Sequence, residues 1–463
     1  MARFRAVRGR TLGGLFRSPN PRDGGGGVVL ALPPLAVGGL LLLTLLAFLG
    51  ASYGPLSPYP AAVLAWVAGV LVLPRVDQGT RRVAGVLLLL GVGCAGLAWL
   101  QGFGVSGPVG IGRAFTINLP ILALFLGVAF LGLLPTEASR SKARGTGLLG
   151  LLLSVHLVGA VINLAAAALV GDSFARDRRE PPRLTRAEAL AITRPYCAAA
   201  FWSPFFVATA VAQTYAPAAK ASITLPLGFL AAAGALLITY VTLRREGAGA
   251  HLGAFQLGRR ALGLTAVLLL AVLGGKVIYP DVSVVIMVAT LAPPLAFLAL
   301  PRAQWAEAGR ALLAEKLPAT AAQHVLFLAA GVFAFGVSTL LDGWLAGQGG
   351  ETFVLGLWAY PATTAAIVGT AYLGVHPVIS IAAAASILTP LGGDPSPMAF
   401  AFVAGWGIGT AVAPLSGMNL FMTGRYGVRP REILRWSPGY AGAMLLWVSL
   451  LMLGVPWLKA VLN

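Results

Sequence analysis

Acidic residues and cysteines are scarce in this sequence of 463 residues. It contains 15 Asp and Glu and two Cys, and charged residues of both signs make up only 10% of the chain. A cation site built from carboxylates, a disulfide framework and a Cys or His cluster with metal-ligand spacing are therefore not expected. We expect no bound metal and no cofactor, and the two cysteines, Cys94 and Cys197, are expected to be buried thiols.

Catalytic motifs are missing as well. No glycine-rich phosphate loop follows a strand, and no Ser, His and carboxylate set stands out, so an enzyme is not expected. What the chain has instead is apolar residues, which make up 58% of it and raise the mean hydropathy to +0.84. Because a soluble core needs far less, the predicted fold class is an all-α polytopic membrane protein, with the lipid bilayer as its surroundings.

Apolar segments of suitable length recur along the whole chain. A helix needs about 20 residues to cross the hydrocarbon layer, and some shorter segments can be re-entrant. The candidate segments lie near 28–51, 60–74, 83–101, 116–134, 146–171, 189–215, 219–243, 261–278, 282–300, 318–340, 353–373, 374–391, 398–423 and 439–457.

The net charge of +18 comes from Lys and Arg residues that lie between the apolar segments. No aromatic residues are interleaved with them, so nucleic acid is not the expected partner. By the positive-inside rule these loops face the cytoplasm of a bacterial-type inner membrane, and the N-terminus is cytoplasmic and retained. The basic segments are 1–27, 75–82, 135–145, 172–188, 244–260, 302–316 and 424–435.

Two consecutive basic loops, 135–145 and 172–188, predict a hairpin between them. Since both loops should lie on one side of the membrane, the chain between them must enter and leave on that side. Residues 146–171, or a neighbouring segment, are therefore predicted to form a re-entrant hairpin.

An internal repeat is indicated by two similar stretches. "VHLVGAVINLAAAALVGD" at 155–172 can be laid over "VHPVISIAAAASILTPLGGD" at 375–394, and an interrupted apolar segment follows each. The loop charges give the two copies opposite directions, as in an inverted repeat. The predicted division is a cytoplasmic N-terminus 1–27, a first transmembrane repeat 28–243, a cytoplasmic linker 244–260 and a second transmembrane repeat 261–463.

The interruptions are the candidate site. Proline has no amide hydrogen and glycine is a weak helix former, so each interruption frees backbone groups where no water is available. Such a break can line a cavity in which carbonyls and helix N-termini bind a solute, or it can be a packing kink. The residues predicted to line a substrate site are Ser203, Pro204, Ser416, Gly417 and Asn419.

Other polar residues inside the apolar segments have two interpretations each. His156 and His376 fall at equivalent positions of the aligned repeat, and they are either coupling residues that take up a proton or structural residues that bond a carbonyl. Asn163 is either a ligand or an interhelical bond. Arg194 and Arg425 lie near the two breaks, where each can snorkel to the surface or balance a bound anion.

A family resemblance adds to these patterns. The 75 or so residues beginning "AYPATTAAIVGTAYLGVHPVISIAAAASILTPLGGD" and reaching "VAPLSGMNLFMTGRYGVRPREI" resemble the second repeat of the divalent anion/sodium symporters and of the wider ion transporter superfamily. His376-Pro377 matches the family's His-Pro pair. The stretch from Ser416 to Asn419 takes the place of its Thr-Pro-Pro-Asn break, and Thr363 and Thr364 fall at its second hairpin tip.

The resemblance implies two inverted repeats, paired hairpins, a homodimer and elevator-type movement, with Thr363 and Thr364 in the substrate site. It places the first hairpin near 102–134, with Thr116-Ile117-Asn118 at its tip, rather than at 146–171. The family's Ser-Asn-Thr signature, which contributes to carboxylate and sodium binding, is intact in neither half. Dicarboxylate and sodium are therefore less strongly implied than the architecture.

Together these features predict a secondary active transporter of a small, anionic organic solute. Na+ or H+ would be the coupling ion, and the site would be formed by the two broken helices. The alternatives are a channel, a structural subunit of a membrane complex and, less favoured, an intramembrane enzyme.

Overall fold

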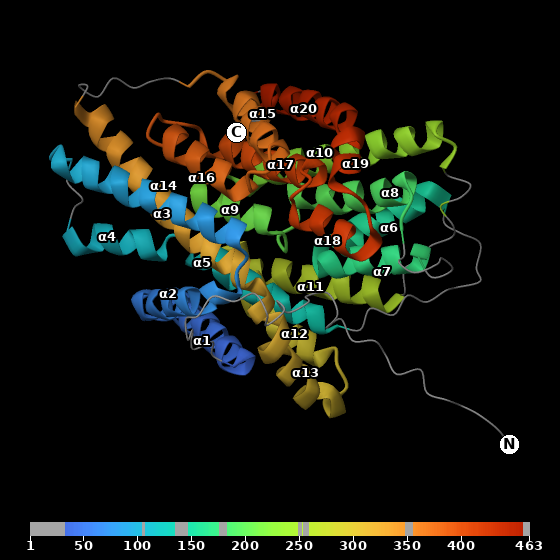
Figure 1. The fold of residues 1–463 in the computed structure, drawn as a ribbon, viewed down its shortest axis with the longest axis horizontal. Coiled ribbons are helices and arrows are strands. Elements are labelled where there is room, and N and C mark those ends of the chain that lie inside the picture. The colour runs from blue at the N-terminus through green and yellow to red at the C-terminus, as the bar shows by residue number, and fades with distance from the viewer. Residues whose placement is uncertain are drawn as a thin grey trace, which may run out of the picture.

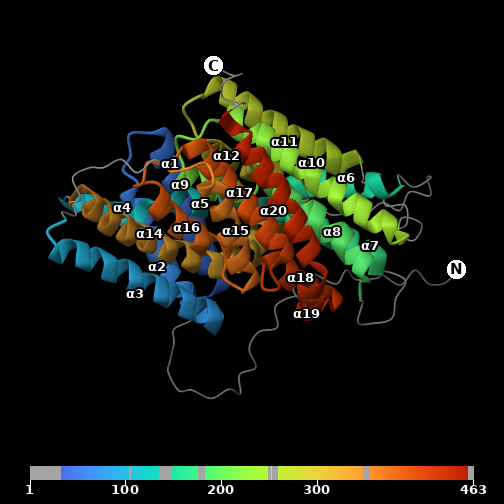
Figure 2. The same ribbon diagram turned by 90° about the horizontal axis from the view of Figure 1, so that it is seen from above.

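The computed structural model describes residues 33–103, 107–134, 147–175, 183–248, 252, 259–347 and 355–456. Within these ranges the chain is helical and has no strand, which confirms the predicted all-α class (Figures 1 and 2). The basic N-terminus 1–27 and most of the linker 244–260 lie outside the described residues.

The helices follow one another with short connections. In the first half they are α1 (Pro34–Tyr53), α2 (Tyr59–Val72), α3 (Gln78–Leu100), α4 (Gly107–Thr116), α5 (Leu119–Ala129), α6 (Gly147–Ile162), α7 (Leu164–Ala175), α8 (Arg186–Ala198), α9 (Val207–Tyr215) and α10 (Ala221–Arg245). In the second half they are α11 (Arg259–Ile278), α12 (Val284–Leu298), α13 (Trp305–Ala311), α14 (Ala321–Gly347), α15 (Ala359–Tyr372), α16 (Pro377–Leu388), α17 (Pro395–Val412), α18 (Gly417–Tyr426), α19 (Pro430–Trp436) and α20 (Pro438–Leu453).

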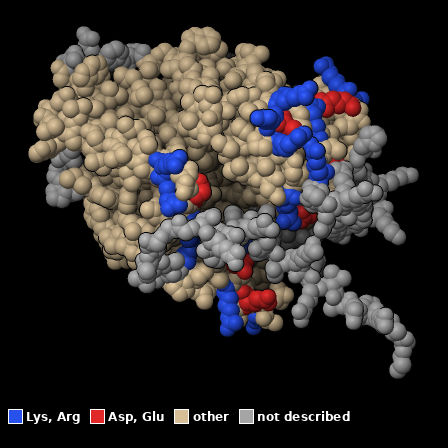
Figure 3. Space-filling model, viewed as in Figure 1, with Lys and Arg blue, Asp and Glu red and all other residues tan. Residues whose placement is uncertain are grey.

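Among the described residues, six helical stretches are long and apolar enough to cross a membrane, or up to seven if the bent pair α19–α20 is one span. The chain is thus a multi-pass membrane protein. Several other expected spans are apolar helices of 10–17 residues. At 1.5 Å per residue these are too short to cross about 30 Å of hydrocarbon. In Figure 3 the visible charged side chains form a few groups on an otherwise uncharged face, as a lipid-facing surface requires.

One end of the bundle is defined by contacts between segments far apart in sequence. Arg425 near the end of α18 pairs with Asp172 near the end of α7, with 2.6 Å between Nη2 and Oδ2. The Leu184 amide, just before α8, donates to the Tyr426 carbonyl at 3.3 Å. The ends of α7 and α18 and the start of α8 therefore lie together. We call this the basic end.

The opposite end is defined in the same way. The Lys220 amide, just before α10, donates to Ser396 Oγ in the first turn of α17 at 3.1 Å. The Asp394 amide donates to the Tyr360 hydroxyl of α15 at 2.8 Å. Consequently α8–α9 runs from the basic end to the opposite end, whereas α17–α18 runs the other way. The inverted directions predicted from loop charge are present in the fold.

The first hairpin consists of α6 and α7. His156 and Asn163 of α6 contact Pro195 and Phe205 respectively, at 2.9 and 3.3 Å, so α6 advances beside α8 away from the basic end. Asn163 then reverses the chain with a φ of 56°, a left-handed conformation that few residues other than Gly and Asn tolerate. Because α7 returns to Asp172 at the basic end, this segment is the predicted re-entrant hairpin.

The second hairpin consists of α15 and α16 and enters from the opposite end. α15 lies close against α17: a Cβ at Gly405 would lie 2.8 Å from Ile367 Cγ2, and one at Gly409 would lie 3.1 Å from Ala371 Cβ. The turn is formed by residues 373–376, with Gly374 at φ 95°. α16 leads back to the start of α17.

Two sequence-based placements are corrected by these hairpins. Residues Gly110–Leu133 form a 24-residue apolar stretch long enough to span, so the first hairpin is not at 102–134 as the resemblance implied. His156 lies on the outgoing arm of its hairpin, whereas His376 lies at the turn and caps α16. The two histidines are thus not equivalent. The Ala-rich segments allowed the copies to be aligned in the wrong register.

The close packing of α3 on α14, visible in Figures 1 and 2, depends on glycine. A Cβ at Gly91 would lie 2.6 Å from the Val332 carbonyl oxygen, whereas a Cβ at Gly93, two residues further along α3, has no atom within 4 Å. Small residues at such crossings let membrane helices approach closely.

We therefore expect Gly91→Val to separate α3 from α14 at a cost of at least about 3 kcal/mol, since backbone atoms cannot move aside as side chains do. The yield of monodisperse protein in detergent should fall steeply. Gly93→Val is the matched control and should match the wild type. Equal yields for the two variants would contradict this packing.

Candidate functional site

The break between α17 and α18 is formed by residues 413–416. α17 ends at Val412, and Ser416 caps the N-terminus of α18 by accepting a hydrogen bond from the Asn419 amide at 3.2 Å. The Ser416 hydroxyl donates back to the Thr410 carbonyl at 2.7 Å. One hydroxyl therefore serves both half-helices, because it accepts from the second and donates to the first.

Asn419 completes this break. Its Nδ2 lies 3.2 Å from the carbonyl oxygens of Thr410 and Ala411 and 2.9 Å from that of Ala413. These are the carbonyls that lose helical partners where α17 ends. Asn419 is 1% exposed. Its amide nitrogen is thus committed to the protein backbone in this conformation, a role that residue type and spacing did not predict.

The break between α8 and α9 is built from different residues with the same logic. After the short 3-10 turn Ala199–Phe201, the Ser203 hydroxyl donates to the Ala160 carbonyl of α6 and accepts from the Phe205 amide at 3.2 Å. Thr209 Oγ1 donates to the Ser203 carbonyl at 2.7 Å. Ser203 is fully buried, and Pro204 follows it where no amide hydrogen is needed.

Each hairpin turn lies against the break of the helix that follows it. Asn163 in the first turn donates to the Phe205 carbonyl at 3.3 Å and accepts from the Tyr196 hydroxyl at 2.8 Å. In the second turn, a Cβ at Gly374 would lie 3.1 Å from Leu415 Cδ1. The first contact is polar and the second apolar, but their placement in the two repeats is the same.

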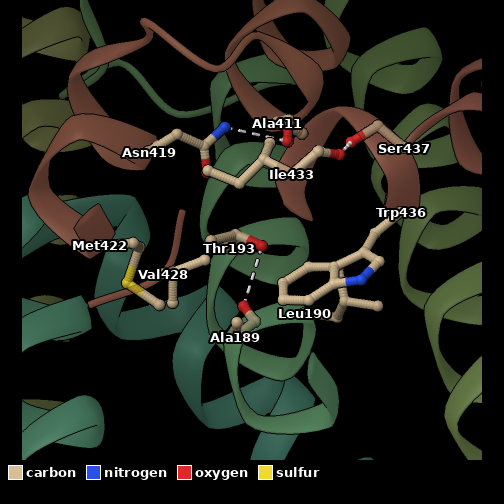
Figure 4. Close-up of a pocket in the computed structure, with 10 residues that line it drawn as sticks. All are labelled: Ala189, Leu190, Thr193, Ala411, Asn419, Met422, Val428, Ile433, Trp436 and Ser437. Atoms are coloured by element: carbon tan, nitrogen blue, oxygen red, sulfur yellow. Dashed lines mark hydrogen bonds between the residues drawn. The ribbon is translucent and has the colours of Figure 1, made fainter. Parts of the chain in front are cut away.

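The two broken helices also contact each other. A Cβ at Gly407 of α17 would lie 2.5 Å from Phe201 Cε1, immediately before the first break. On the basic-end side of this crossing, a small cavity separates α8 from α18 and α19. Figure 4 shows Asn419 and Met422 on one side of it and Trp436 on the other, with Thr193 between them.

The cavity is small in this conformation. The centre of a water molecule can occupy about 10 Å³ there, which is room for about one water. No organic solute fits this space without movement of α8 relative to α18. Of the residues predicted to line a substrate site, Asn419 alone borders this cavity, whereas Ser203, Pro204, Ser416 and Gly417 form the breaks themselves.

The two histidines make structural bonds. His156 Nδ1 lies 2.9 Å from the Pro195 carbonyl, so Nδ1 carries the proton and Nε2 accepts from Trp202 Nε1 at 3.0 Å. His376 Nδ1 accepts from the Val378 amide at 3.3 Å. Both imidazoles therefore stabilise backbone near the breaks, and their role in coupling stays a prediction.

Thr363 and Thr364 do not lie at the second hairpin turn. Both occupy the beginning of α15, where their hydroxyls donate to the carbonyls of Ala359 and Tyr360, at 2.7 and 3.1 Å. Thr364 is fully buried between helices. The implied placement was wrong because the turn comes about two helical turns later in the chain than the family's motif suggested.

The two arginines differ in their surroundings. Arg425 forms a two-pronged pair with Asp172, through Nε at 2.8 Å and Nη2 at 2.6 Å, so it links two re-entrant elements instead of snorkelling. Arg194 is 4% exposed; its Nη2 donates to the Trp436 carbonyl at 3.1 Å, and its guanidinium lies 4.4 Å from the centre of the Tyr440 ring. Partners this distant in sequence left no local pattern to read.

Metal ligation finds no support in the part of the chain that the structure describes, where no group of three or more His, Cys, Asp or Glu could hold an ion. This leaves carbonyls, hydroxyls, amides and guanidinium groups as the chemistry available near the breaks.

Comparisons with known proteins give one distant similarity. No protein-family model matches the chain. No curated protein matches it. Among solved structures it resembles the crystal structure of the Alcanivorax borkumensis YdaH transporter, which is described as having an unusual topology. The match covers 92% of this chain and 98% of that one, at 18% sequence identity and a TM-score of 0.37. The site is therefore interpreted from its own geometry.

The contacts of Asn163 separate its backbone role from its side-chain role. Asn163→Gly should keep the turn but lose the bonds to Phe205 and Tyr196, at about 1–3 kcal/mol. Asn163→Ala should lose the same bonds and add roughly 1–2 kcal/mol for the left-handed backbone. Thermal midpoints in detergent should rank wild type, Gly, Ala. Tyr196→Phe, which removes one bond, should fall between wild type and Gly. A midpoint for Ala above that for Gly would contradict the assignment.

Proposed function

We propose that this protein is a secondary active transporter that moves a small, anionic organic solute through a site between its two broken helices. The observation that carries the proposal is the paired arrangement of turns and breaks. Each hairpin enters from a different end of the bundle, and its turn lies against the break of the following helix. Broken helices in an inverted repeat place polar backbone groups near the middle of the membrane, where transporters bind their solutes.

An anionic solute is favoured by the groups that the second break presents. α18 begins at the break, and its first amides carry the positive end of the helix dipole. Gly417 at that position is exposed, and a Cβ there would have no atom within 4 Å, so a solute could approach its backbone closely. The scarcity of acidic residues near the breaks agrees with this preference.

Elevator-type movement is the proposed mechanism. The hairpins and broken helices would move as one unit against a scaffold that includes α5 and α14. Ser386 Oγ of α16 donates to the Ala334 carbonyl of α14 at 3.2 Å, which marks the boundary between them. Since the cavity beside Asn419 has room for about one water, this conformation has no continuous pore at that point.

Coupling to Na+ or H+ belongs to the proposal. Na+ would use carbonyl and hydroxyl oxygens, because few carboxylates are present. A proton on His156 Nε2 would displace the bond from Trp202, next to the first break. A homodimer, an inner-membrane location and a cytoplasmic basic end complete the proposal, on the strength of the family resemblance and loop charge.

Asn419 offers the first test. Asn419→Ala leaves three carbonyls at the break without their donor, so solute uptake into proteoliposomes should fall at least about tenfold. Uptake would be measured with a panel of radiolabelled small organic anions. Thr423→Ala is the matched control, because its hydroxyl bonds only the Asn419 carbonyl within α18. Wild-type uptake by well-folded Asn419→Ala would refute the role of this break.

Cross-linking tests the elevator. In a variant without Cys94 and Cys197, cysteines at Ala334 and Ser386 should form a disulfide across the proposed boundary. Oxidation should then abolish uptake, and reduction should restore it. The control pair replaces Thr370 and Ser380, whose side-chain oxygens are 2.7 Å apart within the second hairpin. That disulfide should leave uptake intact. Full uptake by the oxidised 334–386 pair would exclude movement at this boundary.

A further inference from the structure

Arg194 is a buried cation with little to compensate its charge. It lies on α8, on the basic-end side of the first break, and is 4% exposed. Of its five N–H donors, one makes a bond, to the Trp436 carbonyl, and the guanidinium stacks on the Tyr440 ring. A carbonyl and a ring offset only part of the cost of removing a guanidinium from water.

No carboxylate among the described residues pairs with Arg194. The acidic side chains of the basic end are bonded to other groups: Asp172 to Arg425, Glu246 to Arg186, Glu432 to Arg183 and Arg429, and Glu188 to Thr185. The other cations at this end thus have anionic partners, and the most deeply buried one does not. A buried charge of this kind normally has a partner, so a negative group is missing from its surroundings.

Tyr440 gives a second, independent indication. It is 3% exposed, and its hydroxyl has no hydrogen-bond partner among the described residues. Buried hydroxyls without partners are rare in folded proteins. The hydroxyl is at the rim of the ring on which Arg194 stacks, so two donors that lack acceptors lie in one place.

We propose that Arg194 and Tyr440 form a binding site for a single oxyanion group, a carboxylate or a phosphate, at the junction of α19 and α20. Two oxygens on one ligand can accept from the planar guanidinium and the phenol together, which a spherical anion does less well. The group can come from a soluble anion or from an anionic lipid headgroup. The site is separate from the two breaks and does not depend on the nature of the cargo.

The position of the site gives it a structural consequence. α19 and α20 meet at a 51° bend at Ser437, directly between Trp436 and Tyr440. Trp436 also borders the cavity opposite Asn419 (Figure 4). An anion bound by Arg194 and Tyr440 would therefore hold this bend and fix one wall of the cavity beside the second broken helix.

Thermal unfolding of the purified full-length protein tests the site. The probes are inorganic phosphate and acetate in detergent, compared with chloride at equal sodium concentration and ionic strength, and nanodiscs of phosphatidylglycerol compared with phosphatidylcholine. A ligand that binds the folded state raises the midpoint in proportion to its affinity. Arg194→Gln should weaken the apparent affinity at least about tenfold, and Tyr440→Phe should weaken it less.

The control is Arg186→Gln, on the same helix, whose arginine already has a carboxylate partner. It should respond like the wild type, and Arg194→Lys should restore part of the response. If Arg194→Gln does not fold, Tyr440→Phe decides, because it keeps the ring beneath the guanidinium. A response to phosphate or acetate identifies a soluble anion, and a response to phosphatidylglycerol alone identifies a headgroup. Equal shifts with chloride, no shift with any probe, or wild-type responses in both variants would overturn the proposal.

Discussion

The structure depends on one constraint: inside a bilayer, every backbone amide and carbonyl must find its partner within the protein. Two helices of this chain are interrupted, and each interruption frees several such groups. Four side chains take them up. Ser416 and Asn419 serve the break between α17 and α18, and Ser203 and Asn163 serve the break between α8 and α9. The breaks are thus built features of the fold, each with its own set of donors and acceptors.

The arrangement of the hairpins follows from this constraint. A break that is not solvated needs a neighbour close to its backbone, and a short hairpin turn can reach it from one side of the membrane without crossing. Asn163 and Gly374 both adopt positive φ to make these turns. The two repeats differ in exposure, however, because Ser203 is fully buried whereas Leu415 is 55% exposed. In this conformation the second break is therefore the more accessible of the two.

Charge is used sparingly and mostly in pairs. At the basic end, ion pairs connect helix termini that are hundreds of residues apart, such as Arg425 with Asp172, and so hold the hairpin against the second broken helix. This use explains why acidic residues are few but not dispensable. It also sets Arg194 apart, since its charge is buried and its contacts are a carbonyl and an aromatic ring.

The sequence by itself determined the all-α class, the positions of both breaks, the opposite directions of the repeats and the hairpin of α6 and α7. These follow from local composition and from loop charge, which act along the chain. Only the tertiary structure decided the register of the repeats, the burial of Thr364, the pairing of Asp172 with Arg425 and the commitment of Asn419 to backbone carbonyls. Each depends on which segments approach each other, and apolar, Ala-rich helices can pack in several registers that their sequences do not distinguish.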